Sequence, residues 1–471
     1  MNKKKSVKDL ICLVESEYDV TSIKLKSFPI WLLIRNYFYF KVTQGSKETL
    51  NLSLKQKLIS LISSFKGFIN FFKQSDAWFF CITIDRVLID GKYFDKYVDF
   101  PARFFKKSLH IEIPFFRHFS KNEVYSKRVA SKAFLILLET IYTKIFLNKI
   151  SIENEHVLKS IFKEYNIDFN YQPAAKKMVA QYLILKFILK FNRPKYVFFG
   201  TSYTNYGYIK ALREKGVKIY EIQHGVISQQ HFGYMVHAKF DKQFFPDKLC
   251  TFGSTELDTF LDDDNNGIRP ENIVAIGNFY LDYIYKNFKK DKIYSELFSK
   301  YLKSISVSLQ DSELGDKLIP FIIFLAEQNT DIIFLIKRRK YSQNYYYSNF
   351  KIPLNMVFLD ELNVYEIILY SDLHITINSS CALEAPFLGV KNLLINIDNF
   401  SETYFGSILP KDSSIILPPD KEIIGNYFTS IKNEVFDPLI IKKGFSTVIS
   451  SNYDQKMTKF LNENIEDQYT I

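Results

Sequence analysis

The chain has 471 residues, of which 47% are hydrophobic, and its formal net charge is +11 at pH 7. This length predicts two or three domains, each with a core of its own. The positive charge favours anionic partners, but Lys and Arg are spread along the chain without a concentrated basic stripe or a known module. Nucleic acid is therefore not expected as a partner.

The four cysteines, Cys12, Cys81, Cys250 and Cys381, lie far apart in the sequence. Their spacing fits neither a zinc site nor a disulfide framework. A reducing cytoplasm is the simplest compartment, and no signal peptide is visible. No stretch offers about 18 uncharged apolar residues, so a membrane-spanning helix is not expected.

In chain order, residues 1–75 have a mixed, mostly helical pattern, and residues 77–84 predict the first buried strand. Asp85 and Arg86 follow this strand directly, and Asp90, Gly91 and Asp95 come shortly after them. A carboxylate at a strand end can act as a general base beside an acceptor hydroxyl. Residues 158–191 have an interrupted helical pattern.

Two segments, 54–73 and 133–150, combine apolar residues at helical spacing with lysines. A basic amphipathic helix can lie in the headgroup region of a membrane. The same pattern fits an ordinary helix packed on a protein core, and both interpretations stay open. The sequence thus raises peripheral contact with the inner face of the cytoplasmic membrane as a hypothesis.

The pattern becomes regular from residue 195. Residues 195–200 predict a strand, 208–215 a helix and 217–222 a second strand. A strand, helix and strand of these lengths form a βαβ unit with parallel strands. The loops that follow the two strands therefore lie at the same edge of a sheet.

Polar residues occupy both of these loops. Thr201 and Ser202 follow the first strand, and the turn Gln223-His224-Gly225 follows the second. Ligands bind at this edge in open α/β sheets. Histidine titrates near neutrality, and glycine lets a ligand approach the backbone. The alternative is a capped strand end with a buried, hydrogen-bonded histidine.

A second alternation of strands and helices follows. Strands are predicted at 248–252, 273–276, 305–309, 331–336, 356–359, 373–377 and 392–395, and helices at 318–328, 364–371 and 380–388. This alternation predicts a second doubly wound parallel sheet. The acidic, Asn-rich stretch 262–267 is expected to be an exposed loop.

Two serines, Ser379 and Ser380, stand where the strand 373–377 passes into a helix. Free N–H groups and the helix dipole at such a start suit a phosphate, and two hydroxyls add donors. Glu384 lies about one turn further on. The alternative is a helix cap that binds no ligand.

Cations and an amide follow two other strands of this second series. Lys337 and Arg338 begin a run of four basic residues that could neutralise a diphosphate, although such runs are usually solvated loops. Gln310 follows the strand 305–309 and is a weaker candidate. The sequence lacks the P-loop, the dinucleotide-binding glycine fingerprint and the G-x-S-x-G turn, which argues against kinases, NAD enzymes and α/β-hydrolases.

These features together resemble bacterial glycosyltransferases of capsule and O-antigen assembly. The resemblance rests on short segments spread over residues 27–400: Pro29-Ile30-Trp31 with Arg35, Asp85-Arg86, Gln223-His224-Gly225 with His231 and Tyr234, and Ser379-Ser380. The last pair is similar to the Ser-Ser motif of bacterial sialyltransferases. The Gln-His-Gly and Ser-Ser segments are the more specific ones.

The resemblance implies an α/β protein of the GT-B type, with two Rossmann-like domains facing across a cleft and helical additions at the N-terminus. The expected domains are an acceptor-side domain at 1–245, a nucleotide-donor domain at 246–425 and a helical segment at 426–471. In such proteins a sugar passes from a nucleotide-sugar to a growing surface polysaccharide or lipid-linked acceptor. The resemblance also implies no metal ion, since GT-B enzymes need none bound by an Asp-x-Asp motif, and no cofactor, since the nucleotide-sugar is a co-substrate.

The implied site follows from the matched segments. His224, Asp85 and Arg86 are expected to be catalytic, and Ser379, Ser380, Glu384, Lys337, Arg338 and Gln310 to bind the donor. Gln223, Gly225, His231, Thr201 and Ser202 are expected to line the cleft.

One departure from the family pattern concerns the donor. Such families often carry His-Pro after the strand equivalent to 331–336, where this chain has basic residues, and that puts a CMP-sugar donor in doubt. Two alternatives stay open: a CDP-polyol phosphotransferase of the teichoic-acid type, which has a similar two-domain plan, and a non-catalytic scaffold of capsule assembly.

Overall fold

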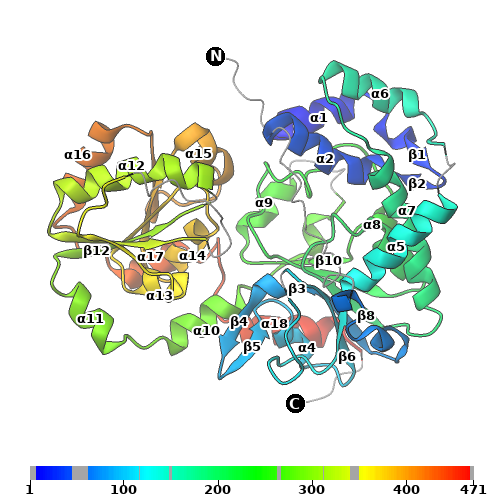
Figure 1. Ribbon diagram of the computed structural model, residues 1–471, viewed down its shortest axis with the longest axis horizontal. Coiled ribbons are helices and arrows are strands. Elements are labelled where there is room, and N and C mark those ends of the chain that lie inside the picture. The colour runs from blue at the N-terminus through cyan, green and yellow to red at the C-terminus, as the bar shows by residue number, and fades with distance from the viewer. Residues whose placement is uncertain are drawn as a thin grey trace. The chain divides into compact units, whose positions relative to one another are not determined.

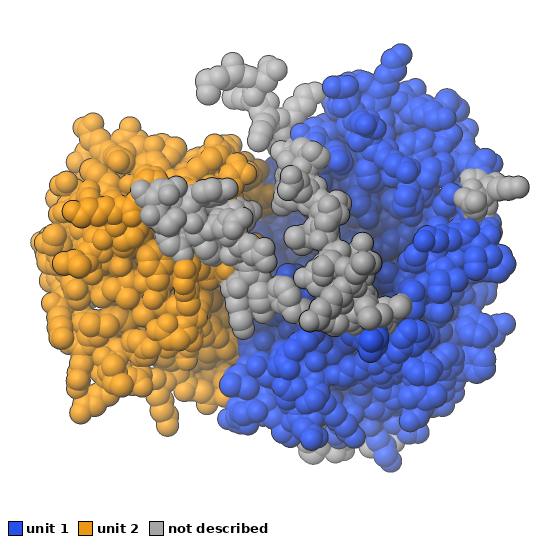
Figure 2. Space-filling view, viewed as in Figure 1, with its two compact units in different colours: residues 1–251, 256–276, 454–471 blue, residues 252–255, 277–453 orange. Residues whose placement is uncertain are grey.

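The structure is a computed structural model that describes residues 7–44, 62–115, 117–147, 151–261, 267–310, 312–339 and 350–466. The chain forms two compact units (Figure 2). The first unit contains residues 1–251, 256–276 and 454–471, and the second contains residues 252–255 and 277–453. The chain therefore leaves the first unit and returns to it more than once.

A seven-stranded parallel sheet forms the centre of the first unit, with the strand order β11-β10-β9-β8-β3-β6-β7. The strands are β3 (Ala77–Ile82), β6 (Ser108–Ile113), β7 (Val129–Ser131), β8 (Tyr196–Phe199), β9 (Lys218–Ile222), β10 (Lys248–Thr251) and β11 (Ile273–Ala275). Most of their residues are buried, as expected of parallel strands covered on both faces.

The remaining elements of the first unit surround this sheet. They are α1 (Val7–Glu17), β1 (Lys24–Leu25), β2 (Phe28–Pro29), α2 (Trp31–Gln44), a 3-10 helix at Phe68–Phe72, the hairpin β4 (Arg86–Ile89) and β5 (Lys92–Asp95), α4 (Asp99–Ala102), α5 (Lys132–Phe146), α6 (Glu155–Glu164), α7 (Gln172–Ile188), α8 (Tyr206–Arg213), α9 (Thr255–Leu261) and α18 (Tyr453–Asn464). No described helix of the chain is long and apolar enough to cross a membrane.

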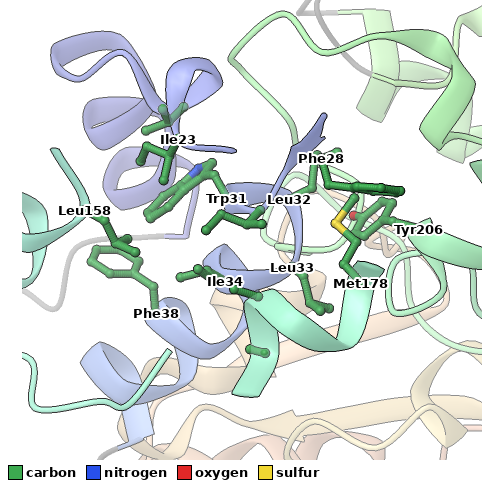
Figure 3. Packing of buried hydrophobic residues seen from close by; sticks show 14 of the residues in the cluster. Ile23, Phe28, Trp31, Leu32, Leu33, Ile34, Phe38, Leu158, Met178 and Tyr206 are labelled. Carbon is green, nitrogen blue, oxygen red and sulfur yellow. The ribbon is translucent and has the colours of Figure 1, made fainter. Parts of the chain in front are cut away.

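The N-terminal helices form an apolar cluster around α2. Trp31 and Phe38 of this helix lie beside Leu158 of α6, and Leu33 lies beside Met178 of α7 (Figure 3). A buried ion pair lies in the same region, since the Arg35 Nε lies 2.8 Å from the Glu15 carboxylate, and both side chains are fully buried. A buried charge is tolerated when it is paired in this way.

A six-stranded parallel sheet forms the centre of the second unit, with the order β14-β13-β12-β15-β16-β17. The strands are β12 (Lys303–Ser308), β13 (Ile332–Lys337), β14 (Met356–Phe358), β15 (Leu373–Thr376), β16 (Lys391–Ile395) and β17 (Ser414–Leu417). The helices are α10 (Phe279–Asn287), α11 (Lys292–Phe298), α12 (Ser312–Gln328), α13 (Val364–Leu369), α14 (Cys381–Phe387), α15 (Phe400–Phe405), α16 (Lys421–Ile431) and α17 (Pro438–Gly444). Helices α12 and α16 cover one face of the sheet, and α13 and α14 lie on the other (Figure 1).

The expected pair of doubly wound α/β units is confirmed. Two strands expected in the second sheet, however, lie in the first sheet. The strands predicted at 248–252 and 273–276 were assigned to the second series, whereas β10 pairs with β9 and β11 pairs with β10 in the first sheet. An apolar run predicts a strand but carries no information on its partner, and this is why the first unit extends beyond residue 245.

The chain end also differs from the expected helical segment 426–471. Helix α16 and α17 pack in the second unit, whereas residues 454–471 belong to the first unit, where the Tyr220 hydroxyl donates to the Asn464 carbonyl. The strand β17 was not predicted. Residues 54–61 and 148–150 of the two amphipathic segments, and 262–266 of the acidic loop, lie outside the described residues.

Candidate functional site at the carboxyl edge of the first sheet

The adjacent strands β3, β8 and β9 end around a cavity of about 150 Å3. Its lining residues come from the ends of β3, β5 and β6, from the loops after β3, β5, β8 and β9, and from the start of α5: Phe80, Cys81, Ile82, Asp85, Asp95, Tyr97, Val98, Ile113, Lys132, Gly200, Thr201, Thr204, Asn205 and His224. Drug-sized ligands occupy cavities of roughly 300–1,000 Å3. This cavity therefore has room for one end of a larger ligand.

His224 lies in this cavity, in the turn after β9. Its Nε2 lies 3.4 Å from the Thr201 hydroxyl, and its carbonyl accepts a 2.9 Å hydrogen bond from the Tyr97 hydroxyl. Burial lowers the pKa of His224, and the negative charge of Asp85 opposes this shift. The imidazole is therefore neutral at neutral pH and can accept a proton.

Asp85 also lines the cavity, at the end of the 3-10 helix Thr83–Asp85 that follows β3. Its carboxylate lies 3.7 Å from the Lys96 ammonium, and both side chains are partly exposed. Together with His224, Asp85 brings a carboxylate and an imidazole to one cavity. Side chains of these two types perform general acid–base chemistry in enzymes.

Gln223 and Gly225 shape the turn on either side of His224. The buried Gln223 amide donates to the Gly225 carbonyl and to the Glu256 carboxylate, both at 2.8 Å, and does not line the cavity. A Cβ on Gly225 would meet no atom within 4 Å, and the residue is not in the left-handed region. Gly225 is therefore not needed for a strained turn, and there is open space beside it.

Asp95 also lines the cavity; the sequence indicates it only within the weak carboxylate group after the first strand, and it is not among the expected site residues. Its Oδ1 accepts hydrogen bonds from the N–H groups of Tyr97 and Val98 at 3.0 and 3.1 Å. Its buried Oδ2 has no hydrogen-bond partner among the described residues. Burial raises the pKa of Asp95 well above its ordinary range, and the nearby carboxylate of Asp99 adds to this effect. The protonated Asp95 can donate a hydrogen bond.

Lys132 is a cavity residue that sequence reasoning missed. It is the first residue of α5, and its Nζ donates a 2.7 Å hydrogen bond to the Asn205 side chain. The ammonium also lies 5.6 Å from the ring centroid of Phe80 and 5.5 Å from that of Tyr208. Burial lowers the pKa of Lys132. The only sequence signal was a lysine placed at the start of an apolar helix.

Arg86 is expected from the sequence to be catalytic, but the structure places it in a buried cluster of ion pairs. Its fully buried guanidinium bonds the carboxylates of Glu112 and Asp99 at 2.6 and 3.4 Å and the Ser126 hydroxyl at 3.1 Å. Asp99 in turn lies 2.8 Å from His110. Arg86 does not line the cavity, and its contacts join the β4–β5 hairpin to α4 and β6. These contacts are those of a structural residue, and they do not support the catalytic role predicted for Arg86.

The other three residues expected to line a cleft, Thr201, Ser202 and His231, have different environments. Thr201 lines the cavity. The buried Ser202 donates its N–H to the Glu221 carboxylate at 3.0 Å, away from the lining. His231 packs against the rings of Tyr203 and Tyr234, and burial lowers its pKa to about 3, so that it stays neutral.

The second unit brings uncharged polar groups to the carboxyl ends of β12 and β15. Gln310 follows β12 and Asn378 follows β15; the Gln310 Nε2 and the Asn378 Oδ1 are buried without a hydrogen-bond partner among the described residues. Ser379 caps α14, since its hydroxyl accepts from the Cys381 N–H at 3.3 Å, whereas Ser380 makes no cap bond. Glu384 is buried and accepts a 3.0 Å bond from Tyr365.

The two cations predicted to bind the donor are engaged within the second unit. The Lys337 ammonium donates to the backbone carbonyls of Asp360 at 2.7 Å and of Leu359 at 3.3 Å. The Arg338 Nε donates to the Asp360 carboxylate at 2.9 Å. The charge of Arg338 is therefore paired with a carboxylate, and the Lys337 ammonium is held by backbone carbonyls.

No protein-family model and no curated protein matches this chain. Solved structures do match it. CalG4, the calicheamicin glycosyltransferase, has a TM-score of 0.50 at 10% sequence identity, covering 84% of this chain and 100% of its own. The chain has the GT-B fold. The UDP-GlcNAc 2-epimerase of Methanocaldococcus jannaschii, in complex with UDP-GlcNAc and UDP, gives 0.49 at 12% identity, covering 82% and 99%.

At these identities the likeness shows the fold alone. One fold of this kind supports many different reactions, so the chemistry has to be argued from the residues at each sheet edge.

Proposed function

We propose that the protein is a cytoplasmic glycosyltransferase that moves a sugar from a nucleotide-sugar to a hydroxyl of a surface-polysaccharide or lipid-linked acceptor. The observation that carries the proposal is the cavity of the first unit, which holds Asp85, Thr201 and His224 at the carboxyl edge of the sheet. A hydroxyl is a weak nucleophile, and a neutral imidazole beside it can remove its proton.

The acceptor would bind in this cavity of the first unit. Its hydroxyl oxygen attacks the anomeric carbon of the donor sugar, and the bond from that carbon to the phosphate oxygen breaks. The hydroxyl proton passes to the His224 ring, and the nucleotide leaves with the bonding electron pair. Asp85 supports this step because its negative charge favours the protonated imidazole.

The neutral Asp95 fits the same proposal. Its Oδ2 lacks a partner among the described residues of the cavity wall, and a protonated carboxyl group can donate a hydrogen bond to a sugar oxygen. Lys132 would hold the opposite side of the cavity through Asn205. These two groups position the acceptor and take no part in proton transfer.

The donor would bind at the carboxyl edge of the second sheet. The Gln310 and Asn378 amide atoms, unpartnered among the described residues, and the Ser380 hydroxyl support this assignment, because they offer both donors and acceptors to a nucleotide. Lys337 and Arg338 would contribute charge only after exchanging their present carbonyl and carboxylate partners.

The test begins with a panel of UDP-, GDP-, CDP- and CMP-activated sugars in a thermal-shift assay. A ligand at about 100 times its Kd stabilises a protein by about 2.7 kcal/mol. The stabilising donor is then incubated with saccharide and lipid-linked acceptors, and the products are weighed by mass spectrometry. A mass increment of one sugar residue is expected. An increment of phosphate plus polyol, or no stabilising nucleotide-sugar, would contradict the proposal.

Variants then connect the activity to the cavity. His224→Ala is expected to lower kcat about 100-fold or more, as is usual when a general base is removed. Asp85→Asn is expected to lower it less, because it acts through the imidazole. The matched controls are the exposed His156→Ala and Asp90→Asn, which should leave kcat unchanged. Full activity of His224→Ala would remove this residue from the mechanism.

A further inference from the structure

An exposed apolar surface covers part of the first unit, away from its cavity lining. It is formed by residues 62–72, by α5 and by the end of α7. Large apolar side chains with exposed fractions between 41 and 66% gather on these elements: Ile62, Phe65, Phe68, Ile69, Ile141, Ile145, Phe146, Phe187 and Phe191. This set is called the apolar face below. Exposure of this many large apolar side chains usually marks an interaction surface.

Ring contacts connect residues 62–72 with the start of α5 and with the segment after α7. Phe65 and Phe68 lie with their ring centroids 5.7 and 5.5 Å from that of Phe134 at the start of α5. On the other side, the Phe72 ring lies 5.6 Å from Phe191, just after the end of α7. Helices α5 and α7 themselves pack side by side (Figure 1). The three elements are thus neighbours in the first unit.

Each of the two amphipathic segments packs on the core with only one side. Phe71 and Leu135 are fully buried, so the 3-10 helix and α5 each pack one side on the core of the sheet. Ile69 and Ile145, on the same two elements, are 52% and 62% exposed. Packing on the core therefore uses only part of the apolar residues of each segment.

The exposed charged residues on the segments that carry the apolar face have one sign, and the neighbouring Glu214 carboxylate pairs with Lys186 of α7 at 3.1 Å. Within residues 62–73, 132–147 and 183–195, every exposed charged side chain is cationic: Lys73, Lys144, Lys190, Arg193 and Lys195. The single acid in these segments, Glu139, is buried and accepts a hydrogen bond from the Tyr208 hydroxyl. An exposed apolar surface with a cationic border is complementary to an anionic lipid surface.

We propose that the apolar face lies on an anionic phospholipid membrane, with its aromatic and aliphatic side chains in the headgroup region and its lysines at the phosphates. A second copy of the chain fits less well. A two-fold contact through this face would bring the cationic border of one copy against that of the other. The inference does not depend on the proposed catalytic activity.

The experiment is co-sedimentation of the full chain with vesicles. One set contains phosphatidylcholine alone and the other equal parts of phosphatidylcholine and phosphatidylglycerol. Binding is expected to the second set and to fall steeply with added salt, because the border charges are exposed. Wild-type protein that stays in the supernatant with phosphatidylglycerol vesicles would overturn the proposal.

Two variants separate the apolar and charged parts of the surface. Ile69→Ser, Ile145→Ser and Phe187→Ser, combined, are expected to abolish sedimentation. Lys144→Glu with Lys190→Glu is expected to weaken it more than tenfold, since each surface cation contributes about a fivefold factor.

Matched controls carry the same kinds of change away from the apolar face. Ile293, Leu439 and Ile440 of the second unit are 74, 68 and 69% exposed, and their combined replacement by Ser should leave vesicle binding unchanged. Lys292→Glu with Lys459→Glu is the charge control, with one change on α11 and one on the exposed side of α18. Equal binding of the apolar-face variant and its control contradicts the proposal. So does a dimer in light scattering that the apolar-face variant converts to a monomer, because the occupant is then a second copy.

Discussion

The carboxyl edges of the two sheets differ in the chemistry that they gather. The first edge places Asp85, Asp95, Lys132 and His224 around a cavity, where burial shifts the pKa values of the last three. The second edge offers hydroxyl and amide groups, and its cations Lys337 and Arg338 are engaged with neighbouring carbonyl and carboxylate oxygens. Two similar folds in one chain are thus suited to different tasks. Titratable groups suit proton transfer, and neutral polar groups suit the binding of a polar ligand.

The largest effect is expected from breaking the ion pairs that support the first edge. Arg86→Met leaves the buried carboxylates of Glu112 and Asp99 without their shared cation, which is expected to cost about 3–5 kcal/mol of the unfolding free energy. Urea denaturation measures this loss. The control is Arg117→Met, because Arg117 is 62% exposed and its pair with Glu123 should contribute less than about 1 kcal/mol.

An activity loss in Arg86→Met without a loss of stability would restore the predicted catalytic role of Arg86. The conservative variant Arg86→Lys should give an intermediate stability, because an ammonium can replace only part of the forked contacts of a guanidinium.

The next effect concerns pH and Glu221, which lies in β9 just before the Gln-His-Gly turn. Burial raises the pKa of Glu221 from 4.5 to about 7. The folded state therefore binds the proton more tightly than the unfolded state. The stability that this proton contributes is complete below about pH 4.5 and is lost as the pH rises through about 7. The full loss is about 3 kcal/mol.

Glu221→Gln cannot ionise and keeps the shape of the side chain. The wild type should lose stability relative to this variant between pH 5 and 8, on the order of a few kcal/mol. Thermal unfolding at a series of pH values checks the difference. Parallel pH profiles of the two proteins would show that Glu221 does not titrate in this window.

The smallest effects on stability are expected at the second edge. Ser379→Ala removes the hydroxyl that caps α14 and should cost about 1 kcal/mol. Ser380→Ala removes a hydroxyl with no cap bond and should change stability by less than about 0.5 kcal/mol. The same two variants in a nucleotide-sugar titration distinguish a cap from a ligand contact. Only Ser380→Ala should weaken binding without a loss of stability.

The sequence was sufficient to predict the local α/β pattern and the position of His224. The strand–helix–strand pattern at 195–222 is specified by residues close in sequence, and β8, α8 and β9 lie within two residues of their predicted bounds. Because parallel strands end at one edge, the sequence alone could place Thr201 and His224 together.

The sequence pattern could not predict how segments that are distant in the chain pack against one another. Asp95 and Lys132 reach the cavity from a hairpin and from the start of α5, and their places depend on how these elements pack against β3. Arg86 follows β3 as Asp85 does, yet it turns inward to Glu112, whereas Asp85 lines the cavity. Neighbouring residues in a chain can thus have opposite environments, which a motif does not reveal.

The division between the two edges is tested most directly by isothermal titration with the nucleotide-sugar that gives the largest thermal shift. We predict that Gln310→Ala with Asn378→Ala weakens donor binding by roughly tenfold or more, as expected for two lost hydrogen bonds. His224→Ala should bind the donor with an affinity within about a factor of two of the wild type, while its kcat falls about 100-fold. Donor binding that is lost in His224→Ala and retained in the second-unit variant would contradict the account.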